Sequence, residues 1–383
     1  MKQFFLSLLL AAVGYCCQVA PVQACTSAVI SGKVTPDGRP LLWKHRDTDF
    51  AQNSVKYVRG ERYNFIAIVN SVADDPTEAW IGTNEAGFSI MNTQSYNLVR
   101  VKPGEERGAA NGTILYRALE VCGSVEEFRT FLDTIAKPSL IEANIGVIDA
   151  SGAAAMFEVD YHRYVMYDAN NPQDAPCGYI ARTNFSFAGK VNDGAGYVRY
   201  MLADKLLLPA SATGELTPQW ILNELSRSFV NPMLGIDLKS GAFNRPHTTG
   251  WFVEQDFIPR AITGSSVVIQ GVKKGEKAEL TTMWTVLGYP PTGVVMPVWL
   301  KGADKNLPAL LARGADKKAP LCDWSQTLSS HIFSYHQGMG SSRYMNWEKL
   351  YNPQGTGYMQ QLAPVEADVF SLTRPVLEAW NQK

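Results

Sequence analysis

The sequence has few of the residues that metal centres and disulfide frameworks require. Its 383 residues include six cysteines and five histidines, without a Cys-x-x-Cys, a His-Glu-x-x-His or a cluster of histidines. Two cysteines fall in an N-terminal leader, and the others are too few for a disulfide scaffold in a chain of this length: Cys25, Cys122, Cys177 and Cys322. We therefore expect neither a metal ion nor an organic cofactor.

An excess of charge of either sign is also missing. The chain has 35 Lys and Arg against 36 Asp and Glu, a formal net charge of −1. This balance gives no reason to expect nucleic acid or an anionic membrane as a partner. Hydrophobic residues make up 46% and charged residues 19% of the chain, which is typical of a globular protein. We expect a single domain over residues 25–383.

The apolar run at the N-terminus is short for a membrane span. Residues 4–13, "FFLSLLLAAV", fall well below the roughly 20 residues that a bilayer requires. Val22 and Ala24 are the small residues that a leader peptidase recognises, so we interpret residues 1–24 as a signal peptide that is cut before Cys25. The mature protein would then be secreted or periplasmic, without stable membrane association, and would begin with Cys25.

Blocks of strands alternate with pairs of helices along the mature chain. A Pro-Asp-Gly turn at 35–40 separates two strand-like runs, 25–34 and 41–49, and predicts a β-hairpin. Further strands are expected over 63–69, 79–83, 87–93, 144–168, 264–271, 281–289 and 293–300, and helices over 113–122, 126–136, 196–208 and 217–229. Because no β-α-β spacing repeats, the class is α+β with layered antiparallel sheets.

Cys25 would carry both a nucleophile and a base if it is the first residue. A thiol nucleophile needs a base, and an α-amino group with a pKa of about 7.7–8 would supply one on the same residue. The histidines are scattered and nominate no partner for the thiol. By position alone Cys25 could instead be a disulfide partner or a lipid anchor, although the bulky Gln23 fits a lipoprotein signal poorly.

The stretch "CTSAVISG...GRPLLWKHRDTD" resembles the start of the choloylglycine hydrolase and penicillin V acylase group of N-terminal nucleophile hydrolases, and of the related acyltransferase-type peptidases. The likeness consists of the Cys25-Thr26 start and an Arg-x-x-Asp on the second strand of the hairpin, here Arg46 and Asp49. It implies a four-layer αββα sandwich, in which two antiparallel sheets lie between helical layers.

Later segments extend the resemblance. "GTNEAGFSIMNTQ" is similar to a segment that ends near an oxyanion-binding asparagine, which is Asn92 here, or Gln94 if the register differs. "YIARTNFSF" points in the same way to Asn184. "GYVRYML" resembles the family's arginine-bearing helix start and points to Arg199, although Gly196 stands where bile-salt enzymes tend to have an extra arginine.

The resemblance implies hydrolysis of linear amide bonds through a thioester on Cys25. Arg46 would favour the thiolate, Asp49 would hold the α-amino group, and the asparagines would stabilise the oxyanion. The implied partners are small N-acyl compounds, such as bile-salt conjugates, N-acyl amino acids or penicillin-type amides, and further copies of the chain in a tetramer. Two alternatives stay open: an acyltransferase of the isopenicillin N type, and a non-catalytic exported binding protein or lipoprotein anchored through Cys25.

Overall fold

The computed structural model describes residues 25–99, 102, 104–105, 108, 110–241, 250–254, 256–336 and 342–382. The predicted signal peptide lies outside these residues. None of the helices in the described ranges combines the length and the apolar character of a membrane span.

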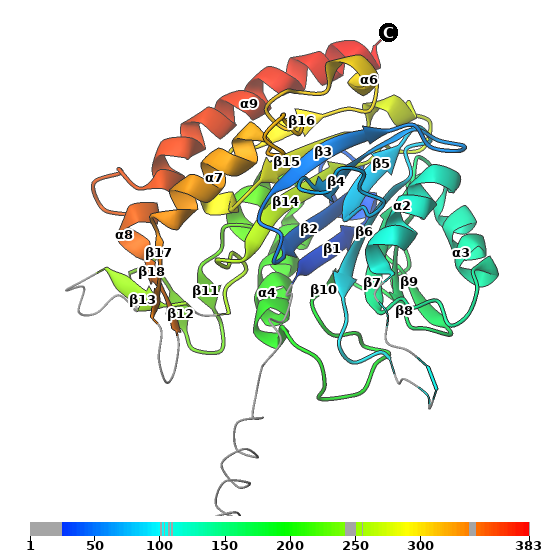
Figure 1. The fold of residues 1–383 in the computed structure, drawn as a ribbon, viewed down its shortest axis with the longest axis horizontal. Helices are drawn as coiled ribbons and strands as arrows, with labels where there is room; N and C mark the ends of the chain where they lie inside the picture. The colour runs from blue at the N-terminus through cyan, green and yellow to red at the C-terminus, as the bar shows by residue number, and fades with distance from the viewer. Residues whose placement is uncertain are drawn as a thin grey trace, which may run out of the picture.

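Two antiparallel sheets form the centre of the molecule (Figure 1). The first has six strands in the order β10 (Tyr179–Arg182), β1 (Thr26–Ile30), β2 (Leu41–Asp47), β14 (Thr263–Gln270), β15 (Thr282–Leu287) and β16 (Met296–Val298). The second has seven strands in chain order: β3 (Asn53–Val58), β4 (Phe65–Asn70), β5 (Ile81–Asn84), β6 (Ser89–Gln94), β7 (Ala143–Ile148), β8 (Ala154–Val159) and β9 (Tyr164–Asp168). Two small sheets pair β11 (Val230–Asn231) with β12 (Ile236–Asp237), and β18 (Ser342–Asn346) with both β13 (Trp251–Val253) and β17 (Phe333–His336).

The two large sheets pack face to face, and each is covered by helices on its other face. A core cluster between the sheets includes Val29 and Leu42 of the first sheet and Ile66 and Met91 of the second. On the outer face of the second sheet lie α2 (Asn111–Val121) and α3 (Val125–Thr134). The outer face of the first sheet packs against α4 (Tyr197–Thr213) and α9 (Tyr358–Asn381). The predicted α+β class and the four-layer αββα arrangement are therefore confirmed.

Apart from α7 (Pro320–Ser330), which has 11 residues, the remaining helical segments have at most five residues each. They are α5 (Pro218–Trp220), α6 (Ala303–Asn306), α8 (Trp347–Leu350), the π-helical η2 (Ile221–Leu225) and three 3-10 turns, η1 (Gly32–Val34), η3 (Ala278–Leu280) and η4 (Pro290–Thr292). Figure 1 shows α2 and α3 together at one side of the sheets and α9 across the top.

One predicted helix is shorter than the sequence indicates. The helix expected over 217–229 begins as predicted, because the Thr217 hydroxyl accepts a hydrogen bond from the Trp220 N–H at 3.1 Å and Pro218 follows it. It ends at Leu225, however. The next residue, Ser226, uses its hydroxyl to accept the indole N–H of Trp43 at 3.0 Å, so a tertiary contact replaces a further helical turn.

Candidate active site

Cys25 lies at the entrance of β1, on the side that faces the second sheet. Because Thr26 pairs with His45 of β2, the strand register places Cys25 opposite Arg46, near the end of β2. The side chain is 6% exposed, and its Sγ lies 3.7 Å from the main-chain oxygen of Asp47. All the cysteines of the described chain, Cys25 included, are free thiols.

Arg199, in the first turn of α4, connects the candidate residues. Its Nη1 donates to the carbonyl oxygen of Cys25 at 2.7 Å and to the hydroxyl of Thr26 at 3.0 Å. Its Nη2 donates to Asn184 Oδ1 at 2.9 Å, and its Nε donates to Asp256 Oδ1 at 3.0 Å. The Arg199 side chain is 1% exposed. The guanidinium thus fixes the main chain of Cys25 and the orientation of the Asn184 amide together.

Gly196 is required beside this guanidinium. It caps α4 with a φ of +84°, a conformation that L side chains rarely adopt. A Cβ at this position would also overlap the Nη2 of Arg199 and approach the Thr183 hydroxyl to 2.9 Å. An arginine at Gly196, which the resemblance leads one to look for, would therefore displace Arg199 from Cys25.

Asn184 lies in the segment between β10 and α4, where an isolated bridge pairs it with Ala195. Because Arg199 donates to its Oδ1, the amide nitrogen must face the other way, and this nitrogen donates to the main-chain oxygen of Gln94 at 2.8 Å. The side chain of Gln94 accepts from Asn111 Nδ2 at 2.6 Å. Gln94 therefore contributes its backbone to the site, while its side chain is occupied by α2.

Lys44 and Arg46 of β2 are two buried cations, and their side chains lie on the same face of the first sheet as the side chain of Cys25. Lys44 Nζ donates to both the main-chain oxygen of Asn92 and its Oδ1, the latter at 2.8 Å. Burial lowers the pKa of Lys44 to about 8 and that of Arg46 to about 10, and the nearby Cys25 opposes both shifts. Within 4 Å neither cation reaches a carboxylate of the described residues. The predicted cation Arg46 therefore has a neighbour, Lys44, that the sequence did not single out.

Arg46 is held by neutral groups. Its guanidinium donates to Oδ1 of Asn53 and, at 2.8 Å, to Oδ1 of Asn70. The ring of Trp80 lies 4.5 Å from its Cζ and 6.0 Å from the Nζ of Lys44. This indole face stabilises both cations without cancelling their charge.

The buried acid beside Cys25 is Asp47, whereas Asp49 lies at the surface. Asp47 is the last residue of β2, and its Oδ1 accepts a hydrogen bond from Thr263 at 2.6 Å. Its Oδ2 has no hydrogen-bond partner and lies 4.0 Å from Arg260 Nη1. Burial raises the pKa of Asp47 to about 7, against the lowering effect of the arginines. The Asp49 side chain is exposed and forms no hydrogen bond or ion pair with another described residue.

No described histidine is hydrogen-bonded to the thiol. His45 faces the opposite side of β2, where its Nε2 lies 3.2 Å from the Thr263 hydroxyl, and burial lowers its pKa to about 3. His162 pairs with Glu105 at 2.9 Å on the surface. The described histidines therefore offer the Cys25 thiol no hydrogen-bonded base.

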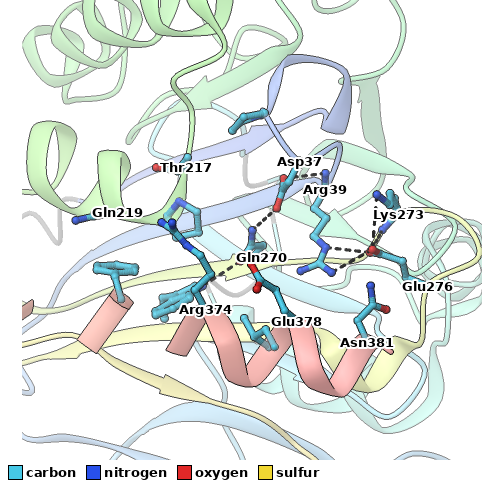
Figure 2. A pocket seen from close by; sticks show the side chains of 15 residues that line it. Asp37, Arg39, Thr217, Gln219, Gln270, Lys273, Glu276, Arg374, Glu378 and Asn381 are labelled. Carbon is cyan, nitrogen blue, oxygen red and sulfur yellow. Dashed lines mark hydrogen bonds and ion pairs between the residues drawn. The ribbon is translucent and has the colours of Figure 1, made fainter. Parts of the chain in front are cut away.

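A cavity of about 450 Å³ lies at the far end of the β1–β2 hairpin (Figure 2). Trp284 and Phe370 stack at 4.5 Å in its wall, and Arg374 reaches it from α9. Asp37 and Arg39 line it from the hairpin turn, which is the end opposite Cys25. None of the predicted site residues lines this cavity, so it is separate from the cluster around Cys25.

Comparisons with known proteins give likenesses at the level of solved structures alone. No family model and no curated protein matches the chain. An N-acylethanolamine-hydrolyzing acid amidase ortholog from Caenorhabditis elegans aligns over 64% of this chain and 92% of its own, at 12% identity and a TM-score of 0.38. A variant of conjugated bile acid hydrolase from Clostridium perfringens covers 72% and 92%, at 12% identity and a TM-score of 0.41. Penicillin V acylase from Agrobacterium tumefaciens covers 73% and 86%, at 13% identity and a TM-score of 0.38. Likenesses this distant give no information on the chemistry of this chain, which has to be argued from its own residues.

Proposed function

We propose that this chain is an exported N-terminal-cysteine amidase, which hydrolyses the linear amide bonds of N-acyl compounds after the leader is cut between Ala24 and Cys25. One observation carries the proposal. The buried guanidinium of Arg199 joins the carbonyl of Cys25, 174 residues away in the chain, to the side chains of Thr26 and Asn184. A nucleophile, an amide donor and a permanent cation thus meet at one end of the sandwich.

The reaction uses the thiol and the amine of the same residue. The Cys25 thiol gives its proton to its own α-amino group, and Sγ bonds to the amide carbonyl carbon. The oxyanion then collapses, the C–N bond breaks, and the α-ammonium returns the proton to the leaving nitrogen. Water attacks the thioester, gives one proton to the amine and releases the acid as the C–S bond breaks. The free amine exists only after the leader is removed, so export activates the enzyme.

Asp47 is the acid that we assign to the α-amino group. It adjoins Cys25, since its main-chain oxygen is the contact of the Cys25 Sγ, and one of its carboxyl oxygens lacks a hydrogen-bond partner. An ammonium brought to a buried carboxyl lowers the pKa of that carboxyl. The mature N-terminus would therefore convert Asp47 to a carboxylate, which then holds the amine in place.

Lys44 and Arg46 supply positive potential to the nucleophile. Both are buried on the face of β2 that Cys25 shares, and neither is neutralised by a carboxylate of the described residues within 4 Å. Buried cations favour a thiolate over a thiol. Asn92 and Asn184 are the donors that we assign to the oxyanion, because the oxygen of each amide is already held by a cation.

The burial of Cys25 weighs against the anchored lipoprotein. A lipid on Sγ needs a position at the surface, whereas Cys25 is only 6% exposed. The substrates we propose are N-acyl amino acids, bile-salt conjugates or penicillin-type amides. The assembly state stays a prediction, with a tetramer implied by resemblance.

The proposal is tested on the secreted protein. Intact mass and N-terminal sequencing should give a chain that begins with a free Cys25 amine. The protein should hydrolyse members of a panel of acyl amides, and Cys25→Ser should lose at least about a thousandfold in kcat. Cys177→Ser, at a half-buried cysteine away from the site, is the matched control and should keep full activity.

Three outcomes would refute the proposal. They are a diacylglyceryl adduct on Cys25, an uncut leader on active protein, and an undiminished rate for Cys25→Ser. Product analysis in the presence of added amines separates hydrolysis from acyl transfer. If the acyl group goes mainly to the amine, the acyltransferase alternative replaces the hydrolase.

A further inference from the structure

The Lys44 ammonium binds Asn92 in a way that fixes the direction of its amide. Lys44 is 2% exposed, and its Nζ donates to the main-chain oxygen and, at 2.8 Å, to Oδ1 of this one residue. An ammonium has only donors, so the amide oxygen must face Lys44 and the amide NH2 must face away. The lysine therefore settles the choice between the two amide orientations, which are otherwise nearly equivalent.

The NH2 group of Asn92 is unused within the described residues. No described acceptor takes its hydrogens, and Asn92 is 3% exposed. Asn53, which is held by Arg46 through its Oδ1, differs in this respect. The Nδ2 of Asn53 donates to the carbonyl oxygens of Phe50 at 2.9 Å and Ala51 at 3.2 Å. Asn92 Nδ2 is not among the buried side-chain atoms of the described residues that lack a partner, so it keeps access to solvent, and its N–H groups can donate to an atom of a bound substrate.

The position of Asn92 agrees with such a role. The next residue of β6, Thr93, donates to the hydroxyl of Ser27 in β1 at 2.6 Å, and Gln94 accepts from Asn184. Residues 92–94 thus run from Lys44 across the strand of Cys25 to Asn184. The two asparagines are held alike, because a buried cation donates to the amide oxygen of each.

We propose that Lys44 is a positioning residue for amide hydrolysis: its ammonium holds the Asn92 side chain with the NH2 group turned toward the oxyanion. The inference rests on the proposed function. Binding of a cation at the amide oxygen also polarises the amide and strengthens its N–H donors. Asn92 is then preorganised before the substrate binds, which is what an oxyanion donor requires.

A double-mutant cycle tests the inference on the mature protein, with Lys44→Met, Asn92→Ala and the two together. Asn92→Ala should lower kcat about a hundredfold, because one oxyanion donor is lost, and should change KM little. If Lys44 acts through Asn92, Lys44→Met should lower kcat by about the same factor, and the double variant should lose no more than Asn92→Ala alone. Lys44→Arg, which can donate to the same two oxygens, should recover at least a tenth of the wild-type kcat. Lys56→Met, at a surface lysine, should leave kcat unchanged.

The results separate this inference from the proposed function. Full additivity on kcat in an active protein, or an unchanged kcat in Lys44→Met, overturns the role of Lys44 while the amidase stands. A wild-type protein that is inactive on every acyl amide overturns both. The same cycle measured by urea unfolding reports whether the two side chains are coupled, independently of activity. Lack of coupling there, with all four proteins folded, would also overturn the inference.

Discussion

Replacing Arg199 by methionine tests the centre of the site. The substitution keeps a long apolar side chain but removes the donors to the Cys25 carbonyl, the Thr26 hydroxyl and Asn184 Oδ1. It also removes the ion pair with Asp256, whose side chain is 36% exposed, and that pair contributes little. The loss of stability therefore comes from the three buried acceptors, which remain without a hydrogen-bond partner.

The magnitude follows from those acceptors. Hydrogen bonds to a charged donor are each worth about 1.5–3 kcal/mol, and they are not additive when one group makes all of them. A buried acceptor that loses its donor and stays unpaired costs about 1–3 kcal/mol. We expect Arg199→Met to lower the free energy of unfolding by about 3–5 kcal/mol. We also expect it to reduce kcat more than a hundredfold, because Asn184 is released.

Urea unfolding and kcat on the best acyl amide check this prediction together. Arg199→Lys keeps the charge without the planar fork, so it should restore part of the stability and little of the activity. Arg374→Met is the matched control, at an exposed arginine of α9 on the separate cavity (Figure 2), and should change neither quantity by much. A free energy of unfolding within 1 kcal/mol of wild type, together with an unchanged kcat, would refute the assignment of Arg199.

Two further predictions concern Gly196 and Asp47. Gly196→Ala should lower the free energy of unfolding by about 1–3 kcal/mol and reduce kcat, since a Cβ at φ +84° is strained and displaces the guanidinium of Arg199; equal kcat and unfolding curves would contradict this. Burial raises the pKa of Asp47 from 3.8 to about 7 in the chain that retains its leader, so the stability from its neutral form is complete below about pH 4 and is lost as the pH rises through 7. This loss is on the order of 4 kcal/mol at most. Asp47→Asn should flatten that decline in urea unfolding at pH 4, 6 and 8, and the same pH slope in both proteins would show that Asp47 is not its source.

The local chemistry of the sequence predicts much of the fold. The Pro-Asp-Gly turn gives the β1–β2 hairpin, and the Ser124 hydroxyl accepts from the Glu127 N–H at 3.1 Å to begin α3, one residue before the helix predicted over 126–136. These features depend on neighbours in the chain. They can therefore be predicted without knowledge of the tertiary structure.

The helix α9 shows where such reasoning fails. It contains Pro364 and Pro375, and an interior proline costs about 3 kcal/mol, so the sequence did not indicate a helix there. Packing compensates in the folded protein, because Phe370 stacks on Trp284 of the first sheet with ring centroids 4.5 Å apart. A contact between residues this far apart in the chain leaves no local signal.

The candidate site depends on a register that the sequence pattern leaves open. Arg46-x-x-Asp49 and Lys44-x-x-Asp47 are the same pattern displaced by two residues, which is one full repeat of a strand. In a regular strand, either pair would place its cation between the two sheets and its acid on the other face of the first sheet. The alternation of side chains along the strand therefore does not distinguish the two pairs. The end of β2 does distinguish them: Asp47 is its last residue and is buried, whereas Asp49 is exposed beyond it. Only a buried carboxyl responds strongly to an ammonium formed beside it. The residue that senses leader removal should therefore be Asp47.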